Sequence, residues 1–304
     1  MELSSALVSV VIPYYNKKDT ILRSVNSVIA QTYTEWELII IDDCGEDRIQ
    51  ENTLPKDDRI RVLFNESNKG AALTRQRGLE NSDGKYIAFL DADDWWDENF
   101  LSYCLMQFEN NNAVDGAYVK TWVINNEGTQ ALRRYCDENH FKIRETLIQF
   151  AKPWQTGGIL WRKANCGNWG ELKTQEDSWF EFSSSKVNIL LPVEGSFYYH
   201  DESGENHLSY YNGRANSTKD QQELFLMVEK NFWKKLSLKY RIVLINRLLR
   251  GQLKIMEYCS ESDTLDYKNK LQQQQYFLGL ISNSQFLLKV IHKVLQGSPY
   301  KIHF

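Results

Sequence analysis

The sequence predicts an α/β fold: a mostly parallel, Rossmann-like central sheet with flanking helices, followed by a helical C-terminal extension. Short apolar runs rich in Val and Ile alternate with segments whose apolar residues recur at helical spacing, as in βαβ units. Two of these runs stop abruptly on aspartates, in Ile39-Ile-Ile-Asp-Asp43 and Ile87-Ala-Phe-Leu-Asp-Ala-Asp-Asp94. Open α/β sheets bind ligands beyond the carboxyl ends of their strands, so a ligand site is expected at these aspartates.

The first strand and helix are expected near the N-terminus. Residues 7–12 are almost entirely apolar, which predicts a buried strand, and Pro13 is expected to end it and turn the chain. Apolar residues then recur at helical spacing over 21–29. Asp19 or Thr20 precedes this segment and is expected to cap the helix.

Four further elements complete the first half of the expected sheet. Residues 36–41 and 59–64 are predicted strands, and turn-prone residues precede the second of them. Residues 71–79 are predicted to be helical, and residues 86–90 to form a fourth strand. This alternation of strands and helices favours a parallel, doubly wound sheet.

The pattern is less regular in the rest of the chain. Residues 98–112 are predicted to form a helix and residues 117–124 a strand. The glycines within 150–210 predict short strands and loops around a helix near 176–183. After about residue 220 the spacing predicts amphipathic helices. Their apolar faces are expected at Leu236, Tyr240, Val243 and Leu244, and again at Phe286, Leu287, Val290, Ile291, Val294 and Leu295.

Composition excludes several classes of protein. The 304 residues are 42% hydrophobic and 25% charged, which is typical of a globular protein rather than a disordered one. The five cysteines include no C-x-x-C pair, so neither a disulfide framework nor a zinc site is indicated, and a reducing cytoplasm is expected. No signal peptide is expected, and no apolar run approaches the roughly 18 residues of a membrane-spanning helix.

The net charge of −4 is unevenly distributed. Residues 221–304 contain 13 Lys and Arg against 6 Asp and Glu, so they carry +7 and the first 220 residues carry −11. Two interpretations of this basic region stay open. Its helices pack on the rest of the chain or pair two subunits in a homodimer, or they contact the inner face of the cell membrane, where lysines beside an apolar face suit anionic lipid.

A set of motifs then points to a family. In chain order they are Val10-Val-Ile-Pro-Tyr-Tyr-Asn16, Ile40-Ile-Asp-Asp43, Asn68-Lys-Gly70, Arg75, Gly78, Gly84, Phe89-Leu-Asp-Ala-Asp-Asp94 and Glu176-Asp177. Over residues 7–185 the chain resembles the family-two inverting glycosyltransferases with the GT-A fold, of the bacterial surface-glycan type. The resemblance implies transfer of a hexose or N-acetylhexosamine from a UDP-sugar to a hydroxyl of a growing surface glycan or glycolipid.

The resemblance also implies a division of the chain. Residues 1–215 would form the catalytic domain, with a nucleotide-sugar half over 1–115 and an acceptor half over 116–215. Residues 216–304 lie outside the match and would form the basic helical region. The implied partners are the UDP-sugar donor and a glycan or lipid-linked glycan acceptor, and no nucleic acid is expected.

The resemblance assigns the donor nucleotide to the ends of the first two strands. Pro13, Tyr15 and Asn16 would border the base. Asp42 and Asp43 would also lie in this site, because a carboxylate there can accept a hydrogen bond from the imino N–H of uracil. An ordinary turn or helix-capping aspartate is the alternative for both positions.

A third motif precedes the helix predicted at 71–79. Asn68, Lys69 and Gly70 would let the backbone approach the donor, because a glycine leaves room for a ligand. Arg75 would place a cation near the diphosphate. The alternative for Arg75 is a solvated charge on the outer face of the helix.

The aspartates after the fourth strand would hold a metal ion. In Asp91-Ala92-Asp93 the first carboxylate would face the sugar hydroxyls and the last would bind Mn²⁺ or Mg²⁺, which take oxygen ligands and bridge phosphates. Neighbouring carboxylates repel one another unless a cation lies among them, which also favours a metal at Asp91 and Asp93. His200 would be a further metal ligand or a diphosphate contact.

An inverting transfer also needs a base on the acceptor side. The resemblance assigns this role to Asp177, with Glu176 in support, and the alternative is a pair of acids favoured at a helix N-terminus. Trp154, Trp169 and Trp179 either stack on sugar rings or fill the core. Two other functions stay open: a sugar nucleotidyltransferase, and a non-catalytic nucleotide-sugar-binding partner in a glycan-assembly complex.

Overall fold

The computed structural model divides into two compact units, residues 1–203 and residues 204–304. The predicted boundary at residue 215 stays a prediction. The described residues are 5–125, 128, 130–132, 142–149, 154–170, 172, 175–201, 213–237, 240, 241, 243 and 244.

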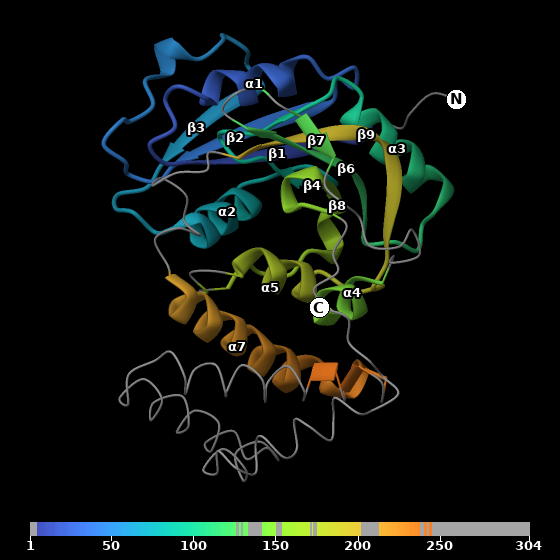
Figure 1. Cartoon of the computed structure of the whole chain (residues 1–304). Helices are drawn as coiled ribbons and strands as arrows, with labels where there is room; N and C mark the ends of the chain where they lie inside the picture. Colours follow the sequence, from blue (N-terminus) through green and yellow to red (C-terminus); the bar gives the residue numbers. More distant parts are fainter. Residues whose placement is uncertain are drawn as a thin grey trace. The chain divides into compact units, whose positions relative to one another are not determined.

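A single mixed sheet forms the centre of the first unit (Figure 1). Its strands are β1 (Val8–Tyr14), β2 (Trp36–Asp42), β3 (Ile60–Phe64), β4 (Tyr86–Phe89), β5 (Trp95–Trp96), β6 (Gly116–Asn125), β7 (Gln130–Leu132), β8 (Ile159–Arg162) and β9 (Leu190–Asp201). Their order across the sheet is β3-β2-β1-β4-β8-β6-β9-β5, and β7 pairs with β6.

The first half of this sheet is parallel, as predicted. Strands β1, β2, β3 and β4 pair side by side in the same direction. In the second half β8 runs antiparallel to both β4 and β6, while β6 and β9 are parallel. Within the described residues the pairings are four parallel and four antiparallel. A sequence pattern marks a strand but not its direction, which depends on partners far along the chain.

Four of the five α-helices described in the first unit lie within two residues of the predicted bounds, and the helix over residues 143–149 was not predicted. The five helices are α1 (Ile21–Ile29), α2 (Ala71–Glu80), α3 (Phe100–Asn110), α4 (Ile143–Gln149) and α5 (Glu176–Ser183). The predicted cap of α1 is wrong in its chemistry. Thr20 holds the N-cap position, but its hydroxyl donates back to the carbonyl of Lys17 at 3.3 Å and no side chain caps the helix.

Pro13 does not end β1. It pairs in register with Ile41, and the strand continues through Tyr14. A parallel strand alternates which backbone groups face each neighbour, so a proline is tolerated where the missing N–H is not needed. The chain leaves the sheet at Tyr15 instead, two residues later than predicted.

Alternate residues of β1 pack against helices on opposite faces of the sheet. Val8, Val10 and Ile12 share a buried cluster with α1 and α3. Val11 points the other way, against α2, where a Cβ at Gly78 would lie 2.2 Å from its Cγ1. Figure 1 shows α1 and α2 on opposite sides of the sheet. The fully buried strand centre follows from this two-sided cover, as in other parallel sheets.

The second unit contains α7 (Gly213–Phe232) and a 3₁₀ turn at Trp233–Lys235. The helical prediction for this region holds for α7. Of the first predicted face, Tyr240, Val243 and Leu244 are helical, and Val243 and Leu244 are buried. Including Leu236 in this face is wrong, because Leu236 lies in a bend after α7 has ended. The second predicted face, over 286–295, lies outside the described residues. No helix in the described part of the chain combines the length and apolar character needed to span a bilayer.

Candidate functional site

The carboxyl ends of β1 and β2 lie beside each other. Tyr14 pairs with Asp42 in the parallel register, and the N–H of Asp43 donates to the carbonyl of Tyr14 at 2.9 Å. The segments that follow the two strands therefore start side by side. The motif after β4 begins at the same edge, since β4 also pairs in parallel with β1.

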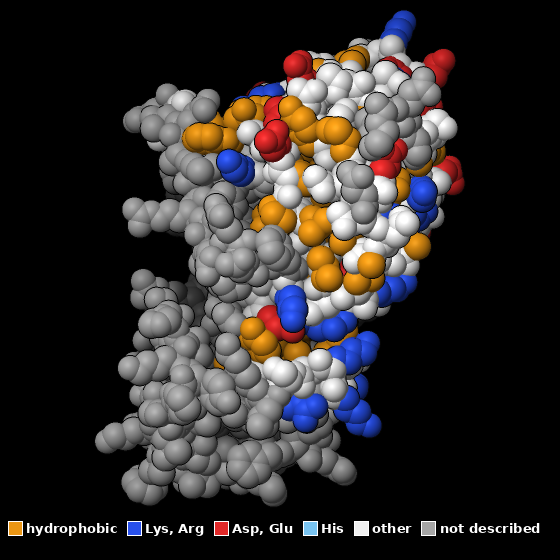
Figure 2. Space-filling view, turned by 90° about the vertical axis from the view of Figure 1, so that its right-hand side faces the viewer, with side chains coloured by type: hydrophobic (Ala, Val, Ile, Leu, Met, Phe, Trp, Pro, Cys, Tyr) orange, Lys and Arg blue, Asp and Glu red, His pale blue; other side chains and the backbone are white. Residues whose placement is uncertain are grey.

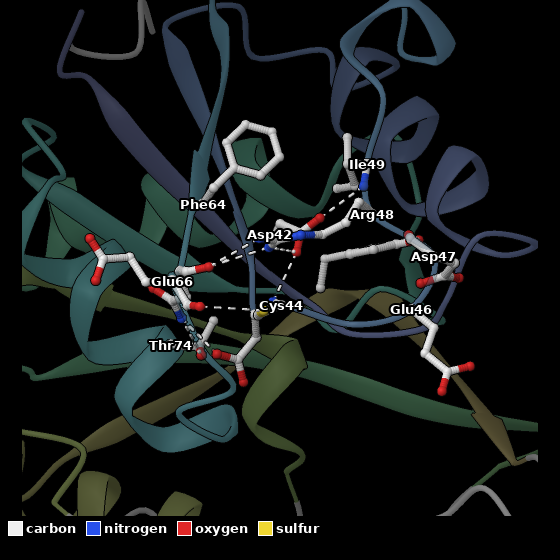
Figure 3. A network of polar contacts seen from close by, with 12 residues as sticks. Asp42, Cys44, Glu46, Asp47, Arg48, Ile49, Phe64, Glu66 and Thr74 are labelled. Carbon is white, nitrogen blue, oxygen red and sulfur yellow. Dashed lines mark hydrogen bonds and ion pairs between the residues drawn. The ribbon is translucent and has the colours of Figure 1, made fainter.

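Asp42 organises the loop that follows β2 (Figure 3). Its buried carboxylate accepts hydrogen bonds from the backbone N–H groups of Cys44 and Ile49, at 3.0 and 2.8 Å, and from the Arg48 guanidinium at 2.8 Å. Asp42 therefore has the structural role of a turn aspartate, which was the alternative to binding the base. The contact of Asp42 with a base stays a prediction.

Asp43 performs the same task for the loop between β3 and α2. Its carboxylate accepts from the Asn65 amide at 2.6 Å and from the backbone N–H groups of Lys69 and Gly70, both at 2.8 Å. The Gly70 N–H also donates to the side-chain oxygen of Asn68 at 3.0 Å. Gly70 has φ +83°, which a residue without Cβ adopts readily. The third motif is thus folded around the second.

Tyr15 and Asn16 form the exposed part of this edge. Tyr15 is 48% exposed, the largest value among the exposed large hydrophobic side chains of the described residues. Asn16 has φ +51° and accepts from the backbone N–H of Glu46 at 2.8 Å, which ties the β1 and β2 loops together. An aromatic ring on a fixed backbone suits stacking on a nucleobase.

The motif after β4 is surrounded by cations. Lys17 Nζ lies 2.9 Å from Oδ2 of Asp93, and Arg75 Nη2 lies 2.6 Å from Oδ1 of Asp91. Ala92, between these aspartates, is buried. Arg23 of α1 donates to the backbone carbonyl of Asp93 at 2.5 Å. The two carboxylates thus face different partners and are held apart.

Asp94, the last residue of the same motif, is buried and bonds to the backbone of β9. Burial raises the pKa of its carboxyl well above the ordinary value, and the charges of Asp93 and Asp91 raise it further. It accepts a 2.9 Å hydrogen bond from the backbone N–H of His200. The structure therefore brings His200 to this motif, through the pairing of β5 with β9. The imidazole's role as a metal ligand stays a prediction.

The residues of this motif fit a divalent cation that binds together with a substrate diphosphate. No group of three or more His, Cys, Asp or Glu side chains gathers among the residues that the structure describes. Mg²⁺ and Mn²⁺ are, however, often held by one or two carboxylates together with substrate phosphates. Asp91 and Asp93 supply that donor set, so the residues fit a cation that binds together with a diphosphate rather than in an all-protein cage.

Arg75 is buried, which rules out the solvated-charge alternative. Its side chain is 9% exposed, and its guanidinium lies between Asp91 and Glu176, with Nη1 3.4 Å from Oε1 of Glu176. The guanidinium also lies 4.8 Å from the ring centroid of Trp169. Arg75 therefore connects the motif after β4 with the acidic pair at the start of α5.

That acidic pair opens α5, as the sequence predicts. Gln175 precedes it in the left-handed region with φ +63°, and Asp177 accepts from the backbone N–H of Ser178 at 2.7 Å. The pKa of Glu176 is raised from 4.5 to about 7, chiefly by burial and also by the charge of Asp177, while the charge of Arg75 opposes the shift.

The three tryptophans fit the core interpretation rather than sugar stacking. Trp154, Trp169 and Trp179 are all buried. The Trp169 ring stacks on Phe180 with centroids 4.3 Å apart and meets Phe89 of β4 edge-on at 4.8 Å. This aromatic cluster fixes α5, and with it the acidic pair, against the sheet.

Lys17, Arg23 and Trp95 were missed as site residues. The Arg23 guanidinium lies 3.9 Å from the centroid of the Trp95 ring, which in turn stacks on Tyr198 at 5.3 Å. For Lys17 a signal existed, because it follows Asn16 directly. Arg23 lies in the first turn of α1, and only the folded structure shows its contact.

Comparisons with known proteins agree with the family that the sequence resembles. The family model for "Glycosyl transferase family 2" matches residues 9–164. Two curated relatives from Escherichia coli are named as UDP-Glc:alpha-D-GlcNAc-diphosphoundecaprenol beta-1,3-glucosyltransferases. WfgD is 41% identical over 121 residues, 40% of this chain and 47% of WfgD, and WfaP is 36% identical over 147 residues, 43% of this chain and 57% of WfaP. The match thus spans about half the length of these relatives.

A solved structure supports the fold over a longer stretch. TarS from S. aureus (residues 1–349), in complex with UDP-GlcNAc, superposes with a TM-score of 0.60 at 17% identity, covering 97% of this chain and 93% of TarS. This likeness confirms the predicted GT-A fold class. Since the family model covers half of the sequence and the fold agrees, the chain belongs to glycosyl transferase family 2.

Proposed function

We propose that the chain is a metal-dependent, inverting glycosyltransferase that moves a hexose or N-acetylhexosamine from a UDP-sugar to a hydroxyl of a growing surface glycan or glycolipid. One observation carries the proposal. Arg75 contacts Asp91 on the donor side and Glu176 on the acceptor side, at 2.6 and 3.4 Å. Residues far apart in the sequence are thereby brought together, which supports one site with a proposed donor side and a proposed base.

The donor side would hold the nucleotide at the carboxyl edge of β1, β2 and β4. Tyr15 offers an exposed ring for the base. The loops fixed by Asp42 and Asp43 would shape the surface around it, and Asn68, Lys69 and Gly70 would bring backbone near the donor. Bound Mn²⁺ or Mg²⁺ would supply positive charge for the departing diphosphate, with Asp93 and Asp91 as its protein ligands.

The acceptor side would supply the base. Asp177 would take the proton from the acceptor hydroxyl as that oxygen attacks the anomeric carbon opposite the diphosphate, a single displacement that inverts configuration. Glu176, with its pKa raised to about 7, would carry part of the negative charge of the pair. Arg75 would orient Glu176, and the buried aromatic cluster keeps α5 in place.

The acceptor is proposed from the relatives' names. WfgD and WfaP are named as enzymes that act on alpha-D-GlcNAc-diphosphoundecaprenol with UDP-Glc. We therefore propose a lipid-linked sugar diphosphate as the first acceptor to test and UDP-glucose as the first donor. A cytoplasmic position at the inner face of the membrane, peripheral contact through residues 216–304, and a homodimer stay predictions.

The test measures binding and transfer separately. The full chain is mixed with UDP-, GDP- and CMP-sugars with and without Mn²⁺, and thermal shifts are recorded; UDP release is then followed with a synthetic prenyl-diphosphate-GlcNAc acceptor. We expect binding of a UDP-sugar, acceptor-dependent release of UDP, and a product with inverted anomeric configuration by NMR. Formation of UTP and a sugar 1-phosphate from the UDP-sugar when pyrophosphate is added would instead indicate a nucleotidyltransferase, and binding without release of UDP would indicate a non-catalytic partner.

Variants make the result specific to the site. Asp177→Asn should bind donor but release little UDP, and Asp93→Asn should lose the metal-dependent part of binding. Asp58→Asn is a matched control, since Asp58 is an exposed aspartate in the turn before β3, at the opposite edge of the sheet. Equal loss in all three variants would show that the site residues have no special role.

A further inference from the structure

Lys17 lies where a metal ion is expected to contact Asp93. Its ammonium is 2.9 Å from Oδ2 of Asp93, and the two side chains are 22% and 18% exposed. An ion pair in this partly shielded position is stronger than a fully exposed one, because less water screens it. An ammonium and a divalent cation cannot both contact this carboxylate oxygen closely, since both are positive and compact.

The backbone of Lys17 is fixed, while its side chain is long. The Lys17 carbonyl accepts from the N–H groups of Thr20 and Ile21, at 3.2 and 3.0 Å, which joins it to the first turn of α1. The preceding Asn16 is tied to the β2 loop through Glu46. Four methylenes separate this fixed point from the charge, so the ammonium can leave Asp93 without any movement of the loop.

Arg75, the cation on Asp91, is in a different situation. Its guanidinium is held from two sides, by Asp91 and by Glu176, and its side chain is only 9% exposed. Of the two protein cations that contact the carboxylates of Asp91 and Asp93, Lys17 is therefore the exchangeable one and Arg75 the fixed one. Because the Lys17–Asp93 ion pair is easier to break than the Arg75–Asp91 pair, Asp93 is the carboxylate that can exchange an ammonium for a divalent cation.

We propose that Lys17 is an intramolecular competitor of the divalent cation: in the donor-free protein its ammonium occupies Asp93, and the cation binds by displacing it. The inference rests on the proposed metal dependence of the site. Lys17 acts as a positioning residue that holds Asp93 in place and lowers the affinity of the Asp93 carboxylate for a cation. Cation binding without a donor is then weak, and Lys17 is released as the cation arrives.

The test is binding of Mn²⁺ alone to the full chain, with free Mn²⁺ measured by electron paramagnetic resonance. Lys17→Met removes the ammonium and keeps the length of the stem. It should bind Mn²⁺ about tenfold more tightly than the unmodified chain, because one competing charge is removed. Lys18→Met is the matched control, an exposed lysine at the next position, and should bind as the unmodified chain does. Circular dichroism checks that each variant is folded.

A second measurement uses the unmodified chain. Reductive methylation of Lys17, quantified by mass spectrometry, should increase when Mn²⁺ alone is added, because the displaced ammonium becomes accessible, while methylation of Lys18 should not change. This readout does not require Lys17→Met to fold. The same sample with Asp93→Asn should show high Lys17 methylation with or without Mn²⁺.

The outcomes separate this proposal from the function on which it rests. If Lys17→Met binds Mn²⁺ no more tightly than Lys18→Met, and Lys17 methylation ignores Mn²⁺, the competition is overturned. Binding of Mn²⁺ in the presence of UDP that disappears in Asp93→Asn would in that case leave the metal-dependent function standing. Absence of any Asp93-dependent Mn²⁺ binding, with or without UDP, would overturn both.

Discussion

The Arg75 guanidinium and the Glu176 carboxylate lie 3.4 Å apart, although 101 residues separate them in the sequence. Arg75 comes from α2, beside the parallel half of the sheet, and Glu176 from the start of α5. Arg75 also holds Asp91 at 2.6 Å. A single buried cation thereby fixes the distance between the two sets of acidic residues to which we assign donor binding and proton removal.

Asp177→Asn should abolish most transfer while leaving donor binding intact. A general base contributes roughly a 10²- to 10⁴-fold acceleration, and an asparagine cannot accept the proton. The measurement is the rate of UDP release with acceptor, beside the affinity for the UDP-sugar. A variant that retains more than half of the activity of the unmodified chain would move the base to another residue.

Arg75→Met should destabilise the fold as well as the site. It leaves the carboxylates of Asp91 and Glu176, which are 42% and 17% exposed, without their shared cation. Removing one partner of a buried ion pair costs about 3–5 kcal/mol, and the partial exposure of Asp91 lowers the loss expected here. Unfolding in urea measures the loss.

A double-mutant cycle shows whether this loss comes from the pair. In a Glu176→Gln background Arg75→Met should cost about 1 kcal/mol less, since one of the two stranded charges is already absent. Strictly additive effects of the two substitutions would contradict a direct interaction.

Glu176 should make stability depend on pH between about 4.5 and 7. Its pKa is raised from 4.5 to about 7 in the folded protein, chiefly by burial, so the native state holds a proton that the unfolded chain has already released. The proton that Glu176 keeps in the folded protein stabilises the fold fully when the pH is below 4.5, the pKa in the unfolded chain. This stabilisation is lost as the pH rises through about 7, the pKa in the folded protein.

The difference between the unmodified chain and Glu176→Gln isolates this contribution. Across that interval the unmodified chain should lose on the order of 2 kcal/mol relative to the variant, which cannot ionise. Asp94, whose pKa is also raised, is present in both proteins and cancels. Urea unfolding at half-unit pH steps gives the comparison, and a difference that stays constant with pH would show that Glu176 does not titrate there.

Gly78→Ala should destabilise the contact between α2 and β1. A Cβ at Gly78 would lie 2.2 Å from Cγ1 of Val11, which is fully buried. Alanine is favoured over glycine in a helix by about 1 kcal/mol, but forcing an atom into a packed interface costs about 1–3 kcal/mol, so a net loss is expected.

The packing explanation for Gly78 has its own control. In a Val11→Ala background the same substitution should be neutral or stabilising, because the clashing methyl groups are gone. Leu73→Ala, on an exposed position of the same helix, should change the melting temperature little. A loss from Gly78→Ala that is as large in the Val11→Ala background would point to the helix itself instead.

The strands of the first half of the fold could be predicted from the sequence, because short local patterns of apolar and turn-forming residues mark their ends. β2 and β3 begin and end within one residue of the predicted bounds, since each is a run of apolar residues between turn-forming ones. β5 and the direction of β8 were not accessible. Trp95 and Trp96 form a strand only because Tyr198 and Phe197 of β9 lie beside them.

The site shows the same division. The aspartates at the strand ends could be placed at one edge of the sheet from sequence, because parallel strands share that edge. The surroundings of Arg75 could not, since the spacing of apolar residues in 71–79 does not say whether a charge faces water or a distant carboxylate. The internal bonds of Asp42 and Asp43 also depend on loops whose shape no local pattern fixes.

The pairing of β6 with β9 has a consequence for how the protein is made. All residues that we propose for the donor nucleotide except His200 precede residue 116, and strands β1 to β4, which position them, pair with one another. Asp177 lies inside the long stretch that β6 and β9 close when Gly116 meets Leu190. During synthesis, when N-terminal segments form first, strands β1 to β4 can pair before Asp177 emerges from the ribosome. If the proposed roles hold, the donor side of the site forms before the side that carries the proposed base.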